Sequence, residues 1–545
     1  MTADPAQLTG IRAADAIARR LYDAGCRHAF GMPGGEVLTM VDALERAGIA
    51  FILAKHENAA GFMAEGVHHR TGAPGILVAT VGPGALNAVN VVANALQDRV
   101  PLIVLTGAID DDEAQTYTHQ VLDQTQVFRP ITKASFRVVA AAAHVIADKA
   151  IAIALEGRPG PVHLDLPISV ADALVPARRG PLRPMASPVA PADGPDLALA
   201  RQWLAAAIRP VMLIGVDAVN QNAGRAIVAF AERYGVPVIS TYKAKGLMPE
   251  DHPLSLGGAG LSPLADTHLL PLLARADLVL AVGYDPIEMR TGWRNPWDPV
   301  LTQVIDITAV PNHHYMHQAT LNFVADSTAT LVAISHTVDP QPTWPDGAPK
   351  QVKAGLLAAF PRDDLWGPAA VIDECRKVLP RDTLASADSG AHRILLSQMW
   401  ECYEPRGLMQ SSALCTMGCA VPLAMGAGIV SPDRVVVSFS GDAGFLMVAG
   451  ELATAAELGL RTIFVVFVDA SLALIEMKQR QRQLPNRGVE FGAHDFAAIG
   501  RAFGGYGVTV ATREDLREAL ENALKAERFT VIGAVIERGS YDGRI

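Results

Sequence analysis

Two apolar runs near the carboxyl end of the chain, residues 434–440 (RVVVSFS) and 462–468 (TIFVVFV), constrain the fold most strongly. Both are rich in Val and Phe and shorter than an ordinary helix, so we predict that they are buried strands. A helical stretch separates them, and two strands joined by a helix form a parallel βαβ unit. The chain is therefore predicted to build open α/β sheets, whose ligands bind at the carboxyl edge of the strands.

Each of these runs ends just before a carboxylate. Asp442 follows the first run after Gly441, and Asp469 follows the second, so the two aspartates are expected at the same edge of one sheet. Hard oxygen ligands suit Mg²⁺, which typically takes one or two carboxylates together with phosphate oxygens of a bound molecule. An aspartate after a strand also serves as an ordinary helix cap, so the pair alone allows both interpretations.

Strand–helix alternation recurs in three series along the 545 residues. We expect a first domain at residues 1–174, a second at 197–338 and a third at 364–545. Two stretches, 175–196 and 339–363, are predicted to be linkers. The first is rich in Pro, Ala and Arg and has no period, and the second begins with the polar, Pro-rich string DPQPTWPDGAPK at 339–350. The predicted fold class is α/β, with three doubly wound parallel-sheet domains.

The composition excludes several kinds of partner. Half of the residues are hydrophobic, and the formal net charge of −10 argues against nucleic acid or an anionic membrane surface as the main partner. The first residues lack the apolar core of a signal peptide, and no apolar run is long enough to span a bilayer. The five cysteines have no metal-type pairing, so we expect all five to be buried thiols in a soluble, cytoplasmic protein.

The whole segment from Gly441 to Lys478 resembles the cofactor motif of the thiamine diphosphate-dependent enzymes, a family that includes acetolactate synthases and 2-oxo acid decarboxylases. In that motif a Gly-Asp pair precedes an Asn or Asp, and here Asp442 and Asp469 are 27 positions apart. The resemblance implies that both aspartates bind Mg²⁺ together with the backbone carbonyl of Ser471. It also implies that Gly441 and the following Ala443 contact the cofactor.

The resemblance extends to the first domain. The string KHENAAGFMAEG places Glu57 at the start of a helix, where the family's catalytic glutamate hydrogen-bonds the aminopyrimidine ring of thiamine. The turn FGMPGG and the string TVGPGALN match loops near the pyrimidine ring, which implies cofactor contacts for Gly34, Gly82 and Asn87. An acidic residue at a helix start is otherwise only a favourable charge at the positive end of the helix dipole.

Two segments of the third domain complete the implied cofactor site. SADSGAH resembles the diphosphate loop, and loop N–H groups and helix N-termini are natural anion sites, so Gly390 and His392 are the implied contacts. CTMGCAVP resembles the segment whose methionine holds thiamine in its bent conformation, which implies this role for Met417. The family usually has glycine where Ala413 and Cys415 stand, and this departure is expected to tighten the loop.

Three features indicate carboligation and resemble the catabolic, flavin-independent acetolactate synthases. THQVLDQTQVFRPITK implies that Gln120 contacts the ketone substrate and that Lys133 contacts the carboxylate of the acceptor. AVGYDPIEMR implies that Arg290 recognises a carboxylate, because a guanidinium fork suits one. LALIEMKQ corresponds to the substrate-lining helix and has Met477 where a tryptophan is usual.

From this resemblance we predict a thiamine diphosphate- and Mg²⁺-dependent carboligase, a homodimer or homotetramer without FAD. It would decarboxylate a 2-oxo acid and transfer the acyl unit to a second carbonyl compound. The first domain would bind the pyrimidine ring and the third the diphosphate, and the central domain is expected to be Rossmann-like. A 2-oxo acid decarboxylase or acyloin lyase that gives an aldehyde is one alternative, and a silent cofactor-binding paralogue is another. The sequence leaves the preferred donor and acceptor open.

Overall fold

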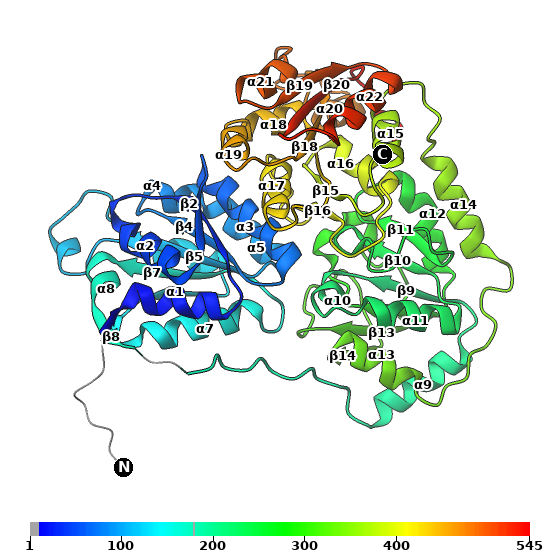
Figure 1. Ribbon diagram of the computed structural model, residues 1–545. Coiled ribbons are helices and arrows are strands. Elements are labelled where there is room, and N and C mark those ends of the chain that lie inside the picture. Colours follow the sequence, from blue (N-terminus) through cyan, green and yellow to red (C-terminus); the bar gives the residue numbers. More distant parts are fainter. Residues whose placement is uncertain (1–9, 178–179) are drawn as a thin grey trace. The chain divides into compact units, whose positions relative to one another are not determined.

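The computed structural model describes residues 10–177 and 180–545. The chain divides into two compact units, the first comprising Met1–Ala186, Pro422–Pro432 and Val448–Leu458, and the second Ser187–Val421, Asp433–Met447 and Gly459–Ile545. The first unit holds one six-stranded parallel sheet and the second holds two, which confirms the predicted fold class (Figure 1). Within the described ranges, no helix is long and apolar enough to cross a membrane.

The sheet of the first unit has the strand order β3-β2-β4-β5-β7-β6. Its strands are β2 (His28–Met32), β3 (Ala50–Leu53), β4 (Gly75–Ala79), β5 (Leu102–Ala108), β6 (Ala134–Arg137) and β7 (Val162–Pro167). The helices are α1 (Ala13–Asp23), α2 (Leu38–Ala47), α3 (Glu57–Thr71), α4 (Pro83–Asn87), α5 (Val89–Gln97), α6 (Gln124–Phe128), α7 (Ala143–Leu155), α8 (Ile168–Asp172) and α19 (Glu451–Glu457). A small antiparallel pair joins β1 (Gly10–Arg12) to β8 (Leu174–Pro176). Every residue of β4 and β5 is buried, because strands covered on both faces are apolar throughout.

The carboxyl-terminal sheet of the second unit has the order β16-β15-β17-β18-β20-β19. Its strands are β15 (Leu384–Ala387), β16 (Leu408–Gln410), β17 (Val436–Gly441), β18 (Ile463–Val468), β19 (Tyr506–Val510) and β20 (Thr530–Val535). The helices are α15 (Pro368–Val378), α16 (Ala391–Met399), α18 (Asp442–Val448), α20 (Ala473–Gln481), α21 (Phe496–Ala502) and α22 (Arg513–Ala523). Helix α17 (Ala420–Val430) also follows β16 in the chain, but most of it belongs to the first unit. Counted along the chain, this sheet and that of the first unit share one strand order, so the two are structurally related.

The central sheet has the order β11-β10-β9-β12-β13-β14, which is the doubly wound order of Rossmann folds. Its strands are β9 (Pro210–Ile214), β10 (Val238–Thr241), β11 (Ser255–Ala259), β12 (Leu278–Val282), β13 (Gln303–Thr308) and β14 (Leu321–Val324). The helices are α9 (Pro195–Ala206), α10 (Val216–Asn220), α11 (Gly224–Tyr234), α12 (Pro263–Ala274), α13 (Ser327–Ser335) and α14 (Ala348–Ala359). The prediction of a linker over residues 339–363 is therefore wrong in part, because α14 occupies twelve of these residues.

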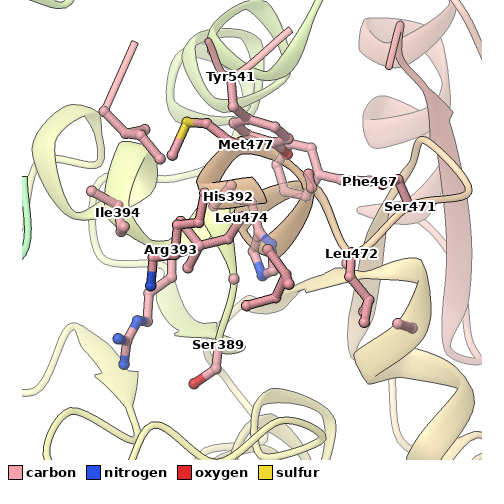
Figure 2. A pocket seen from close by; sticks show the side chains of 18 of the residues that line it. Ser389, His392, Arg393, Ile394, Phe467, Ser471, Leu472, Leu474, Met477 and Tyr541 are labelled. Carbon is pink, nitrogen blue, oxygen red and sulfur yellow. The ribbon is translucent and has the colours of Figure 1, made fainter. Parts of the chain in front are cut away.

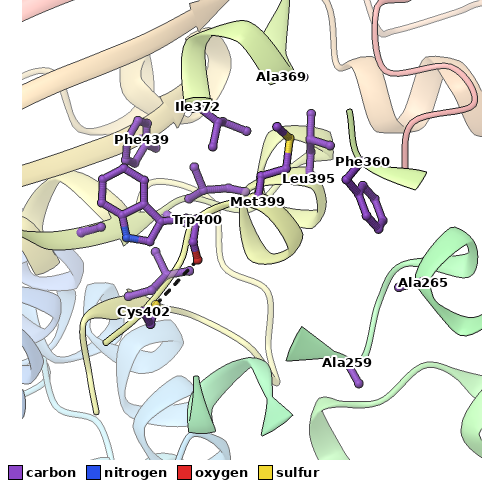
Figure 3. Close-up of a cluster of buried hydrophobic side chains, with 14 of the residues drawn as sticks. Ala259, Ala265, Phe360, Ala369, Ile372, Leu395, Met399, Trp400, Cys402 and Phe439 are labelled. Atoms are coloured by element: carbon purple, nitrogen blue, oxygen red, sulfur yellow. Dashed lines mark hydrogen bonds between the residues drawn. The ribbon is translucent and has the colours of Figure 1, made fainter. Parts of the chain in front are cut away.

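One hydrophobic core runs from the central sheet into the carboxyl-terminal sheet. Figure 3 shows part of it, with Trp400 lying between Phe439 and Cys402. A buried polar link accompanies it, because Glu250 of the central region accepts a hydrogen bond from the backbone N–H of Cys402 at 2.7 Å. This shared core fixes the two sheets to each other, so that loops from both can form one site.

Each of the three six-stranded sheets has a topological switch point, where consecutive connections leave a strand in opposite directions. In the central sheet this point lies between β9 and β12. In the carboxyl-terminal sheet this point lies between β15 and β17, and in the first unit it lies between β2 and β4. A crevice opens at the carboxyl ends of the strands at such a point and is the usual ligand site of open α/β sheets. The loops after β2 and β4, after β9 and β12, and after β15 and β17 are therefore the expected positions of a ligand site.

Candidate active site

The two aspartates at the carboxyl edge of the last sheet lie on adjacent strands. β17 and β18 pair in parallel, with Gly441 opposite Phe467. Asp442 begins α18, and its Oδ2 accepts hydrogen bonds from the backbone N–H groups of Asp469 at 3.2 Å and Ala470 at 2.7 Å. Asp469 in turn accepts the backbone N–H of Ser471 at 3.1 Å. These bonds hold both carboxylates and the Ser471 backbone in one tight turn.

The electrostatics of this pair favour a bound cation. Burial raises the pKa of Asp442, and burial together with the Asp442 charge raises the pKa of Asp469 to about 7. Two partly buried carboxylates disfavour each other's charge, and a divalent cation would relieve that repulsion. No group of three or more His, Cys, Asp or Glu side chains in the described part of the chain could hold a metal. Two carboxylates with a backbone carbonyl fit Mg²⁺, which fills its other positions with water and phosphate oxygens.

Beside the carboxylates, the loop after β15 forms a cradle for an anion. Gly390 has φ +156°, and a Cβ there would lie 2.7 Å from Cε1 of His392, so only glycine fits. His392 is buried and stacks on Phe467 with a ring distance of 5.5 Å. Burial lowers its pKa to about 3, so the ring is neutral, and Nε2 has no hydrogen-bond partner in the described structure. A buried, unsatisfied ring nitrogen at the start of α16 fits a phosphate oxygen.

Asp388, directly after β15, belongs to the SADSGAH string that resembles the diphosphate loop, but we had assigned it no role. It is fully buried and accepts backbone N–H groups from Ser389 at 2.8 Å, Gly418 at 3.0 Å and Cys419 at 3.2 Å. Burial raises its pKa to about 6, although these donors act in the opposite direction. Asp388 therefore fixes the backbone just after Met417. Its place in the SADSGAH string was the available signal.

The pH dependence of stability can test Asp388. Its folded pKa, about 6, is above the unfolded value of 3.8, so between these pH values the folded state binds more protons and Asp388's contribution to stability falls as pH rises. At about 1.4 kcal/mol per pKa unit, that fall is about 3 kcal/mol. The free energy of unfolding of Asp388→Asn, measured in urea, should lack this decrease with pH. The free energy of unfolding of the wild type minus that of the variant should therefore decrease from pH 4 to pH 6.5. Buried His163 and His392, with lowered pKa values, titrate in both proteins and cancel. If this difference in unfolding free energy is the same at pH 4 and pH 6.5, the raised pKa of Asp388 is wrong.

Cys415 corrects two expectations. We predicted five buried thiols, but its thiol is exposed, unlike those of the other four cysteines, all of which the structure describes. Cys415 also has φ +57°, the left-handed conformation that favours glycine. The loop therefore keeps the backbone shape of a glycine at this position and is not tightened there. The sequence could not show this, because solvent exposure and φ depend on how the loop is held from outside.

One cavity of about 530 Å³ brings most of the predicted residues of the second unit together. Figure 2 shows part of its lining, with His392 and Phe467 near the centre and Met477 beside Tyr541. Its walls are mainly apolar beyond the carboxylates. Ten of the predicted residues line it: Arg290, Gly390, His392, Met417, Gly441, Asp442, Ala443, Asp469, Ser471 and Met477.

Arg290 brings a cation from the central sheet to this cavity. Its Nε donates to Asp266 at 2.6 Å, and Asp266 also accepts the indole N–H of Trp293 at 2.9 Å. Its side chain remains 35% exposed. The guanidinium is thus oriented from one side, and the two Nη groups remain for a carboxylate in the cavity.

In the first unit, Glu57 lies at the start of α3 and is only 4% exposed. Its Oε2 accepts a hydrogen bond from Nδ2 of Asn87 at 3.0 Å. Gly82, with φ +71°, precedes α4 and donates its N–H to Oε1 of Gln124 at 2.9 Å. Gln124, buried and not among our predicted residues, therefore anchors the loop that carries Asn87 to Glu57. A polar residue in a short helix gave no sequence signal for this role.

Gly34 and Gln120 lie beside the same loop. A Cβ at Gly34 would overlap the hydroxyl group of Thr80, which lies two residues before Gly82. Gln120 has φ +58°, and its Cβ would be 3.4 Å from a Cβ at Gly82. These residues, with Glu57 and Asn87, gather at the carboxyl edge of the first sheet.

Lys133 lies elsewhere. It precedes β6, and its backbone N–H bonds to the carbonyl of Pro161 just before β7, so it is at the amino edge of the parallel sheet. Its Nζ donates to the carbonyl of Glu156 at 2.6 Å, and burial lowers its pKa to about 8. This position, opposite the edge that carries Glu57, argues against contact with the acceptor substrate. The local motif was misleading because it does not show which end of a strand a flanking side chain occupies.

Comparison with known protein families defines the class of this protein. Models of thiamine pyrophosphate enzymes match residues 11–127 (N-terminal TPP binding domain), 197–334 (central domain) and 388–534 (C-terminal TPP binding domain). The chain belongs to the thiamine pyrophosphate enzyme family and has its thiamine diphosphate-binding domains.

Its relatives include several acetolactate synthases. The chain is 30% identical over 548 residues to the acetolactate synthase of Bacillus subtilis (strain 168), covering 98% of this chain and 95% of that protein. It is 29% identical over 542 residues to the catabolic acetolactate synthase of Raoultella terrigena, covering 96% and 95%. It is 30% identical over 477 residues to the acetolactate synthase isozyme 1 large subunit of Escherichia coli (strain K12), covering 86% and 83%.

Proposed function

We propose that this protein is a thiamine diphosphate- and Mg²⁺-dependent carboligase of the acetolactate synthase type. It would decarboxylate a 2-oxo acid and transfer the acyl unit to a second carbonyl compound. The observation that carries this proposal is the cavity in which the aspartate pair, the unsatisfied ring of His392 and the guanidinium of Arg290 meet. When bound, the cofactor supplies a carbon nucleophile, and the protein supplies binding, orientation and proton control.

The residues of the second unit would bind the charged end of the cofactor and the substrate. Asp442, Asp469 and the carbonyl of Ser471 would hold Mg²⁺. Arg290 would bind the substrate carboxylate through its Nη groups, because Asp266 already holds Nε. Met417 would support the bent thiamine rings. Diphosphate contacts are assigned to Gly390, His392, Gly441 and Ala443.

Glu57 would control the proton on the aminopyrimidine ring. The Asn87 amide donates to one carboxylate oxygen, which orients the other towards a ring nitrogen. Gly34 and Gly82 would allow close approach of the pyrimidine to the backbone. Gln120, next to Gly82, would contact the ketone.

Product analysis with a panel of 2-oxo acids tests the proposal. With pyruvate, we expect acetolactate or another carboligation product to exceed free aldehyde. Aldehyde as the main product would favour a 2-oxo acid decarboxylase or acyloin lyase. No turnover of any 2-oxo acid, despite tight cofactor binding, would indicate a silent paralogue.

We also propose that activity needs no flavin and that the protein is at least a homodimer. The first proposal rests on the GYDPIE string. Turnover should be unchanged by added FAD, and a yellow preparation that requires FAD would contradict it. Light scattering tests the second proposal, which a stable, active monomer would contradict.

Met477 is expected to set the size of the substrate pocket. It lines the cavity, and the resemblance stated above implies a tryptophan as the usual residue at this position, so we expect the protein to accept a donor or acceptor larger than pyruvate. Met477→Trp should shift preference towards pyruvate by about 10- to 100-fold in the ratio of kcat/KM values, since one or two methylenes are worth about 1–3 kcal/mol. Met447→Trp is the control, because Met447 is 64% exposed on α18 and does not line the cavity. If Met477→Trp leaves this ratio of kcat/KM values unchanged, Met477 does not line the substrate pocket.

A further inference from the structure

Arg393, next to His392 on α16, is a buried cation that the proposed chemistry does not use. Its side chain is only 4% exposed, and in Figure 2 its guanidinium points away from Met477 and Tyr541. Nη1 donates to the carbonyl of Ser411, Nη2 contacts Sγ of Cys415 at 3.1 Å, and Nε has no partner in the described structure. No carboxylate of the described residues pairs with it.

Burying the Arg393 guanidinium without a carboxylate partner is unfavourable for stability, which suggests that the residue has a function. A buried guanidinium normally pairs with a carboxylate, because desolvation is otherwise poorly compensated. Here both donated bonds go to neutral acceptors, and both acceptors belong to one short segment, residues 411–417. Arg393 thus connects α16 to this segment at two points, and Met417 is its last residue.

Cys415 gives a reason for the connection. A non-glycine residue at φ +57° is unfavourable and persists only where its surroundings hold it. Its Sγ lies 3.2 Å from the carbonyl of Ser412, to which it donates, and it accepts from Arg393. The side chain that glycine would lack is therefore the one that Arg393 contacts, so the two residues act as a pair.

The backbone after Met417 is held separately. Asp388 accepts the N–H groups of Gly418 and Cys419. Met417 thus lies between a carboxylate anchor on one side and the Arg393–Cys415 contact on the other. Loss of either anchor should leave Met417 free to move within the cavity that it lines.

We propose that Arg393 is a positioning residue that acts through Ser411 and Cys415 to hold Met417 against the thiamine rings. This inference rests on the proposed function. It predicts that Arg393 affects binding of the ring end of the cofactor and not of its diphosphate end, which Gly390 and His392 would hold.

The test compares two ligands in the presence of Mg²⁺, thiamine diphosphate and inorganic diphosphate, by calorimetry. In Arg393→Met, thiamine diphosphate should bind at least tenfold more weakly, while inorganic diphosphate should stay within about twofold of wild type. Arg393→Lys, which keeps the charge but reaches only one acceptor, should be intermediate. His392→Ala should weaken both ligands. The proposal would be overturned if Arg393→Met weakened the binding of both ligands equally, or if it weakened the binding of neither.

Glycine at position 415 provides a second, independent measurement. Because glycine adopts a positive φ freely, Cys415→Gly added to Arg393→Met should restore at least fivefold of the lost thiamine diphosphate affinity. No restoration would overturn the pairing of Arg393 with Cys415. Arg376→Met is the control, because Arg376 lies over Trp400 at 4.5 Å and does not line the cavity. Its affinity for thiamine diphosphate relative to its affinity for inorganic diphosphate should equal that of the wild type. A wild-type protein that binds neither ligand would instead overturn the proposed function.

Discussion

Glu57→Gln should lower kcat by about 100-fold or more and leave thiamine diphosphate affinity within about threefold of wild type. General acid–base catalysis contributes typically 10²- to 10⁴-fold, and an amide cannot deliver the proton that a carboxyl group delivers. The glutamine side chain has the same shape and can still accept the hydrogen bond from Asn87, so the local structure should persist. Steady-state kinetics and cofactor titration by fluorescence provide the measurements.

Glu65→Gln is the matched control. Glu65 lies on the same helix, is 1% exposed and accepts a hydrogen bond from Nδ2 of Asn94 at 3.2 Å, much as Glu57 does from Asn87. It differs in lying one residue beyond the middle of α3, away from the loop of Gly82. Glu65→Gln should retain the kcat of the wild type. If Glu57→Gln also retains kcat to within about threefold, Glu57 is not a catalytic residue.

Asp442→Ala should abolish Mg²⁺-dependent binding of thiamine diphosphate, with a loss of affinity of about 100-fold or more. The two phosphates would then face a site with one carboxylate, which is too little to hold the bridging cation. The substitution also removes the acceptor for the N–H groups of Asp469 and Ala470. Asp442→Asn separates the two effects, because its amide oxygen can still accept these bonds but carries no charge. Both variants should fail to bind in calorimetric titrations with Mg²⁺.

Asp495, which caps another helix, provides a control for the alternative that Asp442 is only a helix cap. Asp495 caps α21 by accepting the N–H of Ala498 at 2.9 Å, and its loss should cost about 1 kcal/mol of stability. Asp495→Ala should therefore destabilise the protein and bind the cofactor normally. If Asp442→Ala behaves in the same way, Asp442 is only a helix cap.

The two variants together test the proposed oligomer. The resemblance to thiamine diphosphate-dependent enzymes implies that the glutamate and the aspartates of one site come from different subunits. Mixing inactive Glu57→Gln and Asp442→Ala proteins under conditions of subunit exchange should then restore part of the activity. No recovery after demonstrated exchange would show that both residues of a site belong to one chain.

Much of the candidate site follows from sequence because its residues lie where local patterns are informative. Asp442 and Asp469 end two apolar runs, and parallel strands bring their carboxyl ends to one edge. Gly390 and His392 follow a third such run, so the sheet order alone places them in the same crevice. The shared strand order of the first and last sheets also agrees with the repeated strand–helix pattern of the sequence.

Other features depend on contacts between distant segments. Lys133 has the expected sequence neighbours but lies at the amino edge of its sheet. Gln124 reaches Gly82 across 42 positions, and Arg393 reaches Cys415 across 22. Such hydrogen bonds leave no periodic trace, because a single polar residue at one position changes neither the strand nor the helix pattern around it.

The sequence by itself determined the fold class and the edge at which a ligand binds, since apolar periodicity and short-range turns specify strands, helices and the loops that follow them. The family came from the resemblance of the motifs in those loops. Only the tertiary structure decided which side chains hold those loops. It showed an exposed Cys415 in a left-handed conformation, a buried Arg393 that pairs with no carboxylate of the described residues, and the buried anchors Asp388 and Gln124. The physical reason is that burial and hydrogen-bond satisfaction are properties of packed segments, which meet only when the whole chain is folded.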